Sequence, residues 1–238
     1  MTPSEQRDFI RNYLVPELKR ASVAVGILVL DHNYDQFNDI NTILDDDVVR
    51  ASVRGTAYHC YSGDYTQMSL NHHPELPMFQ TECASMLDDE PQDLFKEWME
   101  GYVLGPITLG SVGAMAWNLC LDQTGGVHDH GCYGCAGLMT TDFSEAEPTL
   151  NYSPEYYALA HFSRFLRNSE RVELEGGDAD LQAVAFANAD GAMSAMLWNG
   201  SDIVKTIRLQ VDACNSFEYD VPPQSATTFV WDNETPTM

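Results

Sequence analysis

The chain has 238 residues, and its 12 lysines and arginines against 36 aspartates and glutamates give a formal net charge of −24. A surface this negative repels phosphates, which argues against binding of a nucleic acid. The length provides for one large domain or two modest ones. No apolar run reaches the roughly 18 residues of a membrane-spanning helix, and residues 1–11 lack the apolar core of a signal peptide. The sequence therefore predicts no transmembrane segment.

The six cysteines are too few and too scattered for a small fold that depends on disulfides. Three of them lie in or at the end of apolar runs, where a cysteine is typically a buried thiol. Cysteine usage leaves the redox compartment open.

Residues 4–21 predict the first helix, because apolar side chains recur at spacings near three and four, and Pro16 is expected to kink it. The continuous apolar run at residues 23–30 predicts a parallel strand buried on both faces. This run ends at Asp31.

Further strands are expected at residues 53–61, 77–81 and 111–119, with an amphipathic helix at residues 92–104. Strands separated by loops or helices indicate a β/α succession, in which the carboxyl ends of parallel strands share one rim. The side chains expected at that rim are Asp31, His59, Tyr61, Glu82, Trp117 and Asn118.

Glu82 follows a short apolar run, where an unpaired carboxylate costs several kcal/mol in desolvation. A catalytic role explains a glutamate at this position. A structural glutamate, paired with an arginine or capping the next helix, is the alternative.

A complete eight-stranded barrel needs about 250 residues, so this succession predicts only half of one. One more helix is expected at residues 154–166, and from residue 171 short runs between turns predict an antiparallel β-sandwich, with a hairpin turn at residues 189–191. We therefore expect a half-barrel domain over residues 1–167 and a β-sandwich domain over residues 168–238.

Four segments carry a family resemblance: residues 55–64 (GTAYHCYSGD), 81–83 (TEC), 117–122 (WNLCLD) and 156–165 (YYALAHFSRF). In their order and spacing they resemble glycoside hydrolase family 30, which includes glucosylceramidases and endo-β-1,6-glucanases. The resemblance implies a (β/α)8 barrel with an attached β-sandwich and hydrolysis of β-glucosides with retention of configuration. It implies no cofactor, and it favours a secreted protein.

The resemblance also implies roles for the six rim residues. Transferred position by position, Glu82 is the nucleophile on the seventh barrel strand. Asp31 on the fifth strand, and His59 and Tyr61 on the sixth, surround the bound sugar. Trp117 on the eighth strand is the aromatic floor of the sugar site, with Asn118 beside it. A retaining glycosidase needs an ionised nucleophile and a protonated acid about 5 Å apart.

The family's acid/base glutamate lies in an Asn-Glu-Pro-like motif at the end of the fourth strand, and no such motif occurs in this sequence. We therefore expect barrel strands five to eight only, and a chain that is inactive by itself. Three explanations compete: a truncated gene model, which we favour, a chain that assembles with a separate N-terminal half, and a non-catalytic remnant that still binds carbohydrate. A half-barrel would expose strand edges and apolar surface.

By this resemblance the expected activity is glucosylceramidase-like, in sphingolipid metabolism, with endo-β-1,6-glucanase as the alternative. Residues 128–135 (HDHGCYGC) raise a separate hypothesis, because two histidines and a C-x-x-C pair could bind zinc. A local disulfide and two free thiols explain this spacing equally well, and we assign no metal site.

Overall fold

The computed structural model describes residues 1–126, 129–144, 146–166, 168–176, 180–211 and 215–232. The chain forms two compact units. Unit 1 comprises residues 1–85 and 105–119, and unit 2 comprises residues 86–104 and 120–238.

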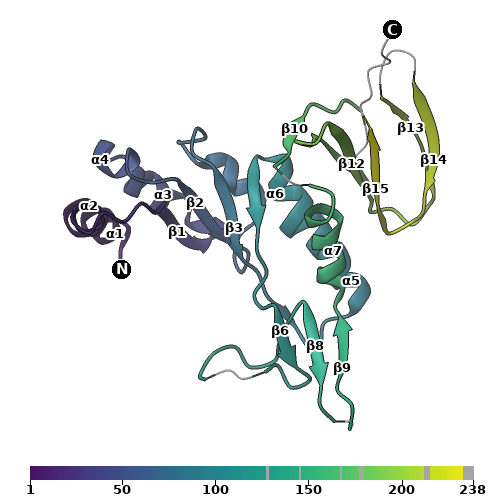
Figure 1. Cartoon of the computed structure of the whole chain (residues 1–238), viewed down its shortest axis with the longest axis horizontal. Helices are drawn as coiled ribbons and strands as arrows, with labels where there is room; N and C mark the ends of the chain where they lie inside the picture. The colour runs from purple at the N-terminus through teal and green to yellow at the C-terminus, as the bar shows by residue number, and fades with distance from the viewer. Residues whose placement is uncertain (127–128, 145, 167, 177–179, 212–214, 233–238) are drawn as a thin grey trace. The chain divides into compact units, whose positions relative to one another are not determined.

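Unit 1 is a β/α succession around a parallel sheet (Figure 1). In the described part of the chain this sheet has the order β1-β2-β3-β5, and each neighbouring pair is parallel. Its strands are β1 (Leu28–Asn33), β2 (Gly55–His59), β3 (Met78–Glu82) and β5 (Ser111–Ala114). Its helices are α1 (Pro3–Phe9), α2 (Val15–Arg20), α3 (Phe37–Leu44), α4 (Asp47–Arg50) and α6 (Gly105–Thr108), with 3-10 turns at Tyr34–Gln36 and Tyr65–Leu70. The predicted succession of parallel strands is confirmed.

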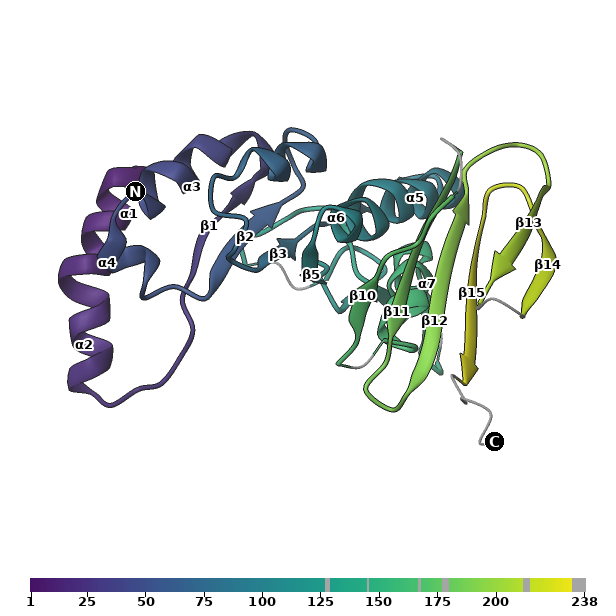
Figure 2. The same cartoon turned by 90° about the horizontal axis from the view of Figure 1, so that it is seen from above.

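The predicted first helix is divided by a π-helical turn, Ile10–Leu14, that joins α1 to α2 (Figure 2). This turn ends at Leu14, two residues before Pro16, which has no N–H to donate. At its end the Val15 N–H bonds to the carbonyl oxygen of Ile10, five residues back. Pro16 itself lies in the first turn of α2, and the kink expected there stays a prediction.

Several predicted strand boundaries are wrong, since β1 also runs on to Asn33 and β2 spans only Gly55–His59, and two of the differences are large. The apolar run at residues 23–30 was expected to be strand throughout, but pairing begins only at Leu28, and Val23 and Val25 are exposed. The run at residues 111–119 ends as a strand at Ala114, so Trp117 and Asn118 lie in the following loop. In both cases the apolar residues extend beyond the segment that has a pairing partner, and strand structure follows the pairing.

The two faces of the unit 1 sheet differ in their side chains. On one face Gly55 lies between Leu28 and Phe79, and a Cβ there would stand 2.4 Å from the carbonyl oxygen of Pro77 and 2.9 Å from the Phe79 ring. Glycine is therefore required for this close approach. The other face contributes Val29, Tyr58 and Met78 to a core shared with the helices, whose buried residues include Ile40, Ile43, Leu44 and Val49.

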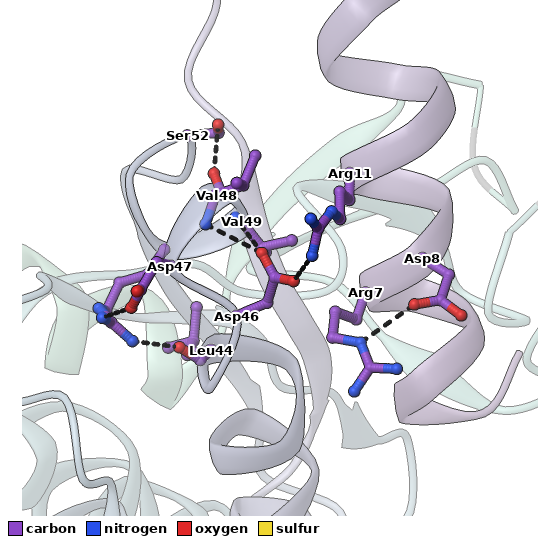
Figure 3. A network of polar contacts seen from close by, with 10 residues as sticks. Arg7, Asp8, Arg11, Leu44, Asp46, Asp47, Val48, Val49 and Ser52 are labelled. Atoms are coloured by element: carbon purple, nitrogen blue, oxygen red, sulfur yellow. Dashed lines mark hydrogen bonds and ion pairs between the residues drawn. The ribbon is translucent and has the colours of Figure 1, made fainter.

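α4 joins this core through a capped first turn (Figure 3). Asp46 accepts hydrogen bonds from the N–H groups of Val48 and Val49, at 2.9 and 3.1 Å, and its second oxygen forms an ion pair with Arg11. These contacts orient the short helix so that Val49 is completely buried, while Val48 is 46% exposed.

The adjacent valines of α4 provide a test of this packing. Val49→Ala removes two buried methyl groups and should lower the free energy of unfolding by about 2 kcal/mol. Val48→Ala makes the same change in a largely exposed side chain and should change it by less than about 0.5 kcal/mol. Chemical denaturation of both variants measures the difference, and equal effects would contradict the burial described above.

In its described residues, unit 2 contains helices, two antiparallel sheets and a small sheet that combines parallel and antiparallel pairing. The helical segments are α5 (Pro91–Glu97), a π-helical turn at Trp98–Leu104 and α7 (Pro154–Ser163). The described strands outside the sandwich are β6 (Cys120–Asp122), β7 (Cys135–Ala136), β8 (Met139–Asp142) and β9 (Thr149–Tyr152), and β4 (Ser85–Met86) lies where the chain passes from unit 1 to unit 2.

The rest of unit 2 is a two-sheet sandwich (Figure 2). One sheet has the order β10-β11-β12-β15, and the other is the hairpin β13-β14. The strands are β10 (Glu170–Val172), β11 (Leu181–Ala187), β12 (Ala192–Asn199), β13 (Lys205–Gln210), β14 (Ser216–Val221) and β15 (Ser225–Asp232). Both sheets supply one apolar core, which includes Ala195 and Leu197 on β12 and Leu209 and Val221 on the hairpin. The predicted β-sandwich is confirmed.

His161 of α7 connects that helix to the sandwich. Its Nδ1 lies 2.8 Å from Oγ1 of Thr228 on β15, and its ring meets Phe95 edge to face at 6.4 Å. Burial lowers the pKa of His161 below its ordinary value of 6.5. The folded state therefore favours the neutral imidazole.

This depressed pKa gives unit 2 an acid sensitivity. Well above pH 6.5 His161 is neutral in both states. As the pH falls through this value the unfolded chain takes up the proton first, so stability decreases down to the lower pKa of the folded state. His161→Gln should lose this part of the pH dependence in thermal melts between about pH 7 and about pH 5. His72→Gln, the same change at an exposed histidine of unit 1, should keep the wild-type slope.

Candidate active site

The carboxyl ends of β2 and β3 bring His59 and Glu82 together. Each is the last residue of its strand, and the two are paired across the sheet. In the described structure His59 Nε2 lies 3.9 Å from Glu82 Oε2. Two chemically active side chains thus share the edge at which β2 and β3 end.

Asp31 reaches this edge through a bulge in β1. It is the unpaired residue between Leu30 and His32, and the φ angles of Leu30 and Asp31 are 73° and 54°. This left-handed region suits aspartate far better than leucine. The bulge places Asp31 Oδ1 3.0 Å from His59 Nε2 on the neighbouring strand.

A second bulge, in β3, sets the direction of Glu82. Tyr58 pairs with Gln80 and His59 with Glu82, so Thr81 is the extra residue. Because side chains alternate along a regular strand, one extra residue allows two consecutive side chains to face the same edge. Thr81 Oγ1 accordingly donates to Asp31 Oδ1 at 2.7 Å, while Glu82 lies beside His59.

Tyr61 donates its hydroxyl hydrogen to Glu82 Oε1 at 2.9 Å. Tyr61 is about half exposed, but the partial burial of its phenol raises its pKa well above the ordinary value of 10.0, and the hydrogen bond and negative charge of Glu82 raise it further. The phenol therefore remains a hydrogen-bond donor at any physiological pH. Glu82 itself keeps 32% of its side chain exposed, so it is supported by the protein and still open to a ligand.

Asp31, His59, Tyr61 and Glu82 form one connected cluster, and these are four of the six predicted rim residues. Asp31 Oδ1 accepts a hydrogen bond from the Thr81 hydroxyl and also contacts His59 Nε2. This arrangement suits a carboxylate that binds hydroxyl groups.

Trp117 and Asn118 approach the cluster through the backbone. The N–H of Trp117 donates to the carbonyl oxygen of Cys83, the residue after Glu82, at 2.6 Å. The Trp117 side chain is 45% exposed, and the peptide bond between Trp117 and Asn118 is cis. The predicted roles of both side chains toward a sugar stay predictions.

The expectation of buried thiols at the apolar strand ends is wrong for Cys60 and Cys83. These residues form a disulfide with their Cα atoms 5.5 Å apart. Cys132 and Cys135 form a second one among the described residues, while Cys120 is an exposed free thiol and Cys214 lies outside the described residues. Each of the two cysteines adjoins a rim residue in the sequence, but only the parallel pairing of β2 with β3 brings them together.

Sequence reasoning also missed Thr81 and the buried Gln80. Neither could be recognised without the bulge, since regular alternation would direct Thr81 and Glu82 to opposite faces.

Two of the four ligands in the zinc hypothesis, Cys132 and Cys135, are joined in a disulfide, and His128 lies outside the described residues. In the described parts of the chain no group of three or more histidine, cysteine or acidic side chains is arranged to hold a metal.

Family models agree with this architecture. Residues 1–166 match the glycosyl hydrolase family 30 TIM-barrel domain, and residues 168–229 match the glycosyl hydrolase family 30 beta sandwich domain. The chain belongs to glycosyl hydrolase family 30. The family resemblance that its sequence motifs indicated is therefore confirmed.

Relatives of this family 30 chain include two kinds of hydrolase. It is 30% identical to the endo-1,6-beta-D-glucanase BGN16.3 of Trichoderma harzianum, over 95% of this chain and 46% of the relative. It is 25% identical to the lysosomal acid glucosylceramidase of Mus musculus, over 97% of this chain and 47% of the relative. The solved endo-beta1,6-glucanase BT3312 has 31% identity and a TM-score of 0.89, over 98% of this chain and 54% of that structure. The chain thus spans about half the length of the relatives it matches.

None of the helices in the described residues is long and apolar enough to cross a membrane.

The Tyr61–Glu82 contact can be tested by titration. Glu82→Gln removes the negative charge that opposes formation of the phenolate, so the pKa of Tyr61 should fall toward 10.0 while burial keeps it raised. Absorbance titrations of Glu82→Gln with and without Tyr61→Phe isolate this single phenol. Glu75→Gln makes the same change at an exposed residue that contacts His73, and it should leave the Tyr61 pKa unchanged. An unchanged pKa in Glu82→Gln would mean that burial alone sets it.

Proposed function

We propose that this chain carries the nucleophile of a retaining β-glucoside hydrolase, and that Glu82 is that nucleophile. The observation that carries the proposal is the hydrogen bond from the Tyr61 hydroxyl to Glu82 Oε1 at the carboxyl edge of the sheet. With Oε1 occupied by Tyr61, Oε2 is the oxygen available for attack on the anomeric carbon. The ionised form is the reactive one, and a neutral phenol donor stabilises it.

The proposed reaction has two displacements. Glu82 Oε2 forms a bond to the anomeric carbon as the bond to the leaving oxygen breaks, and that oxygen takes a proton from a general acid. Water, deprotonated by the same group acting as a base, then attacks the anomeric carbon and releases Glu82. The sugar leaves with its original configuration because it has been inverted twice.

We assign the surrounding residues to sugar binding. Asp31 and His59 are proposed to hold the hydroxyl groups of the bound sugar, since a carboxylate accepts and an imidazole can donate or accept hydrogen bonds. The exposed face of Trp117 is proposed to cover the apolar side of the ring, with Asn118 as a polar neighbour. These assignments rest on the motif positions and on the cluster of contacts around His59.

The general acid is proposed to come from polypeptide beyond these 238 residues. Two observations support this: the chain spans about half of each relative it matches, and in the described residues the unit 1 sheet has four strands with β1 and β5 at its edges. We propose that these strands are barrel strands five to eight and that the chain alone is inactive. A partner half would pair with both edges and supply the acid.

β-1,6-Glucan is the substrate that the comparisons favour, because identity to the two endo-1,6-beta-D-glucanases of Trichoderma and Neurospora is 30% and 32%. Glucosylceramide, the substrate first expected from the sequence, is the second candidate, with identity of 25% to the mouse lysosomal enzyme. The two disulfides support a secreted or otherwise oxidised location, since they persist in such compartments.

Labelling with an activated 2-deoxy-2-fluoro-β-glucoside tests the proposal. The chain joined to the acid/base half should hydrolyse aryl β-glucosides and carry the label on Glu82, and Glu82→Gln should lower the rate by about 10⁴-fold or more. The exposed Glu75→Gln should retain wild-type activity. Turnover by the 238-residue chain alone would contradict the need for a second half, and labelling of another carboxylate would contradict the role of Glu82.

Comparison of β-1,6-glucan with glucosylceramide in the same assay identifies the substrate. A joined protein that binds glucan without cleaving it would favour the carbohydrate-binding alternative over an enzyme.

A further inference from the structure

The Cys60–Cys83 bond, here called the rim disulfide, lies directly beside the Tyr61–Glu82 contact. Cys60 immediately precedes Tyr61, and Cys83 immediately follows Glu82. Cys83 is completely buried and Cys60 is partly buried. The rim disulfide therefore joins the two backbone segments one residue away from each partner of the contact.

Backbone pairing holds these two segments only loosely. The Thr81 bulge interrupts the pairing of β2 with β3, which ends at His59 and Glu82. Beyond that point the Cys60 N–H donates to the carbonyl oxygen of Glu82 at 3.3 Å, longer than a typical backbone hydrogen bond. Tyr61 then lies in a bend that begins at Cys60, with about half of its surface exposed. A covalent link at this point holds the two segments together where the bulge weakens the pairing of their strands.

The Cys83 side of the rim disulfide is fixed from the core. Gln80 Nε2 lies 2.8 Å from Cys83 Sγ, and the Tyr34 hydroxyl donates to Gln80 Oε1 at 2.7 Å. Both Gln80 and Tyr34 are almost completely buried. The carbonyl oxygen of Cys83 also accepts the N–H of Trp117. Because the S–S bond links Cys60 to Cys83, it also restrains the backbone at Cys60 and at Tyr61, the residue that follows.

We propose that the rim disulfide is a positioning element that keeps the Tyr61 hydroxyl on Glu82 Oε1 and so sets the rate at which Glu82 attacks the sugar. This rests on the nucleophile role proposed above for Glu82. Without the bond, the phenol can move away from the carboxylate, which then has weaker support for its charge. Displacement of about 1 Å at a reacting group is enough to reduce a rate by about 10- to 100-fold.

A double-mutant cycle in the joined, active protein tests the proposal. Cys60→Ala/Cys83→Ala should lower kcat by about 10- to 100-fold with a much smaller change in KM, and Tyr61→Phe should lower it to a similar extent. The combined variant should be no slower than either alone, because the disulfide acts through Tyr61. The matched control, Cys132→Ala/Cys135→Ala, removes the disulfide of unit 2 and should leave kcat unchanged.

Reduction provides the same test without a substitution at the rim. In the Cys132→Ala/Cys135→Ala background, dithiothreitol breaks the S–S bond by giving two electrons and two protons to the sulfurs, and it closes its own ring disulfide. The rate should fall with the appearance of the two thiols and recover on reoxidation. An unchanged kcat, or additive effects of Cys60→Ala/Cys83→Ala and Tyr61→Phe, would overturn the proposal.

A titration of the 238-residue chain separates this proposal from the proposed enzyme activity. Loss of the rim disulfide should lower the pKa of Tyr61, because the phenol moves away from Glu82 and into water. This result is expected even if the joined protein hydrolyses no glucoside, in which case the proposed function fails and the positioning of Tyr61 is still measured. A Tyr61 pKa that does not change on loss of the bond would overturn the positioning role by itself.

Discussion

The candidate site of unit 1 depends on the placement of one partly buried carboxylate, Glu82, at the end of a parallel strand. A charge that is removed from water needs hydrogen bonds from the protein, since burial without them costs several kcal/mol. Tyr61 supplies a donor at 2.9 Å, and His59 lies 3.9 Å from the other oxygen. The sheet provides this support because adjacent parallel strands end at the same edge, where residues that are distant in the chain become neighbours.

A regular sheet would not bring these side chains together. The bulges at Asp31 and Thr81 break the alternation of β1 and β3, so that additional polar groups face the rim. Such departures from regular pairing weaken the ladder at the positions for which chemistry is proposed. The Cys60–Cys83 bond and the buried Gln80 compensate at the same level of the sheet. The two bulges and the disulfide thus lie at the same edge of the sheet.

Unit 2 has a different physical basis. Its sandwich is held by an apolar core shared between two antiparallel sheets. On the opposite face of β12, the buried Trp198 donates its Nε1–H to Glu100 Oε1 at 2.8 Å. Membership in glycosyl hydrolase family 30 accounts for the presence of both architectures in one chain. Since the chain spans about half of its relatives, the catalytic proposal concerns a site whose second carboxylate is assigned to another segment.

The sequence by itself determined the parallel strands, the β-sandwich and the rim cluster, because apolar periodicity and the polar residues at strand ends are local signals. It placed His59 and Glu82 correctly at their strand ends. Only the tertiary structure decided that bulges at Asp31 and Thr81 bring Thr81 to the edge where Asp31 lies, that Cys60 bonds to Cys83, and that β1 begins at Leu28. These features depend on the register between strands, and register is fixed by pairing partners that no local pattern specifies.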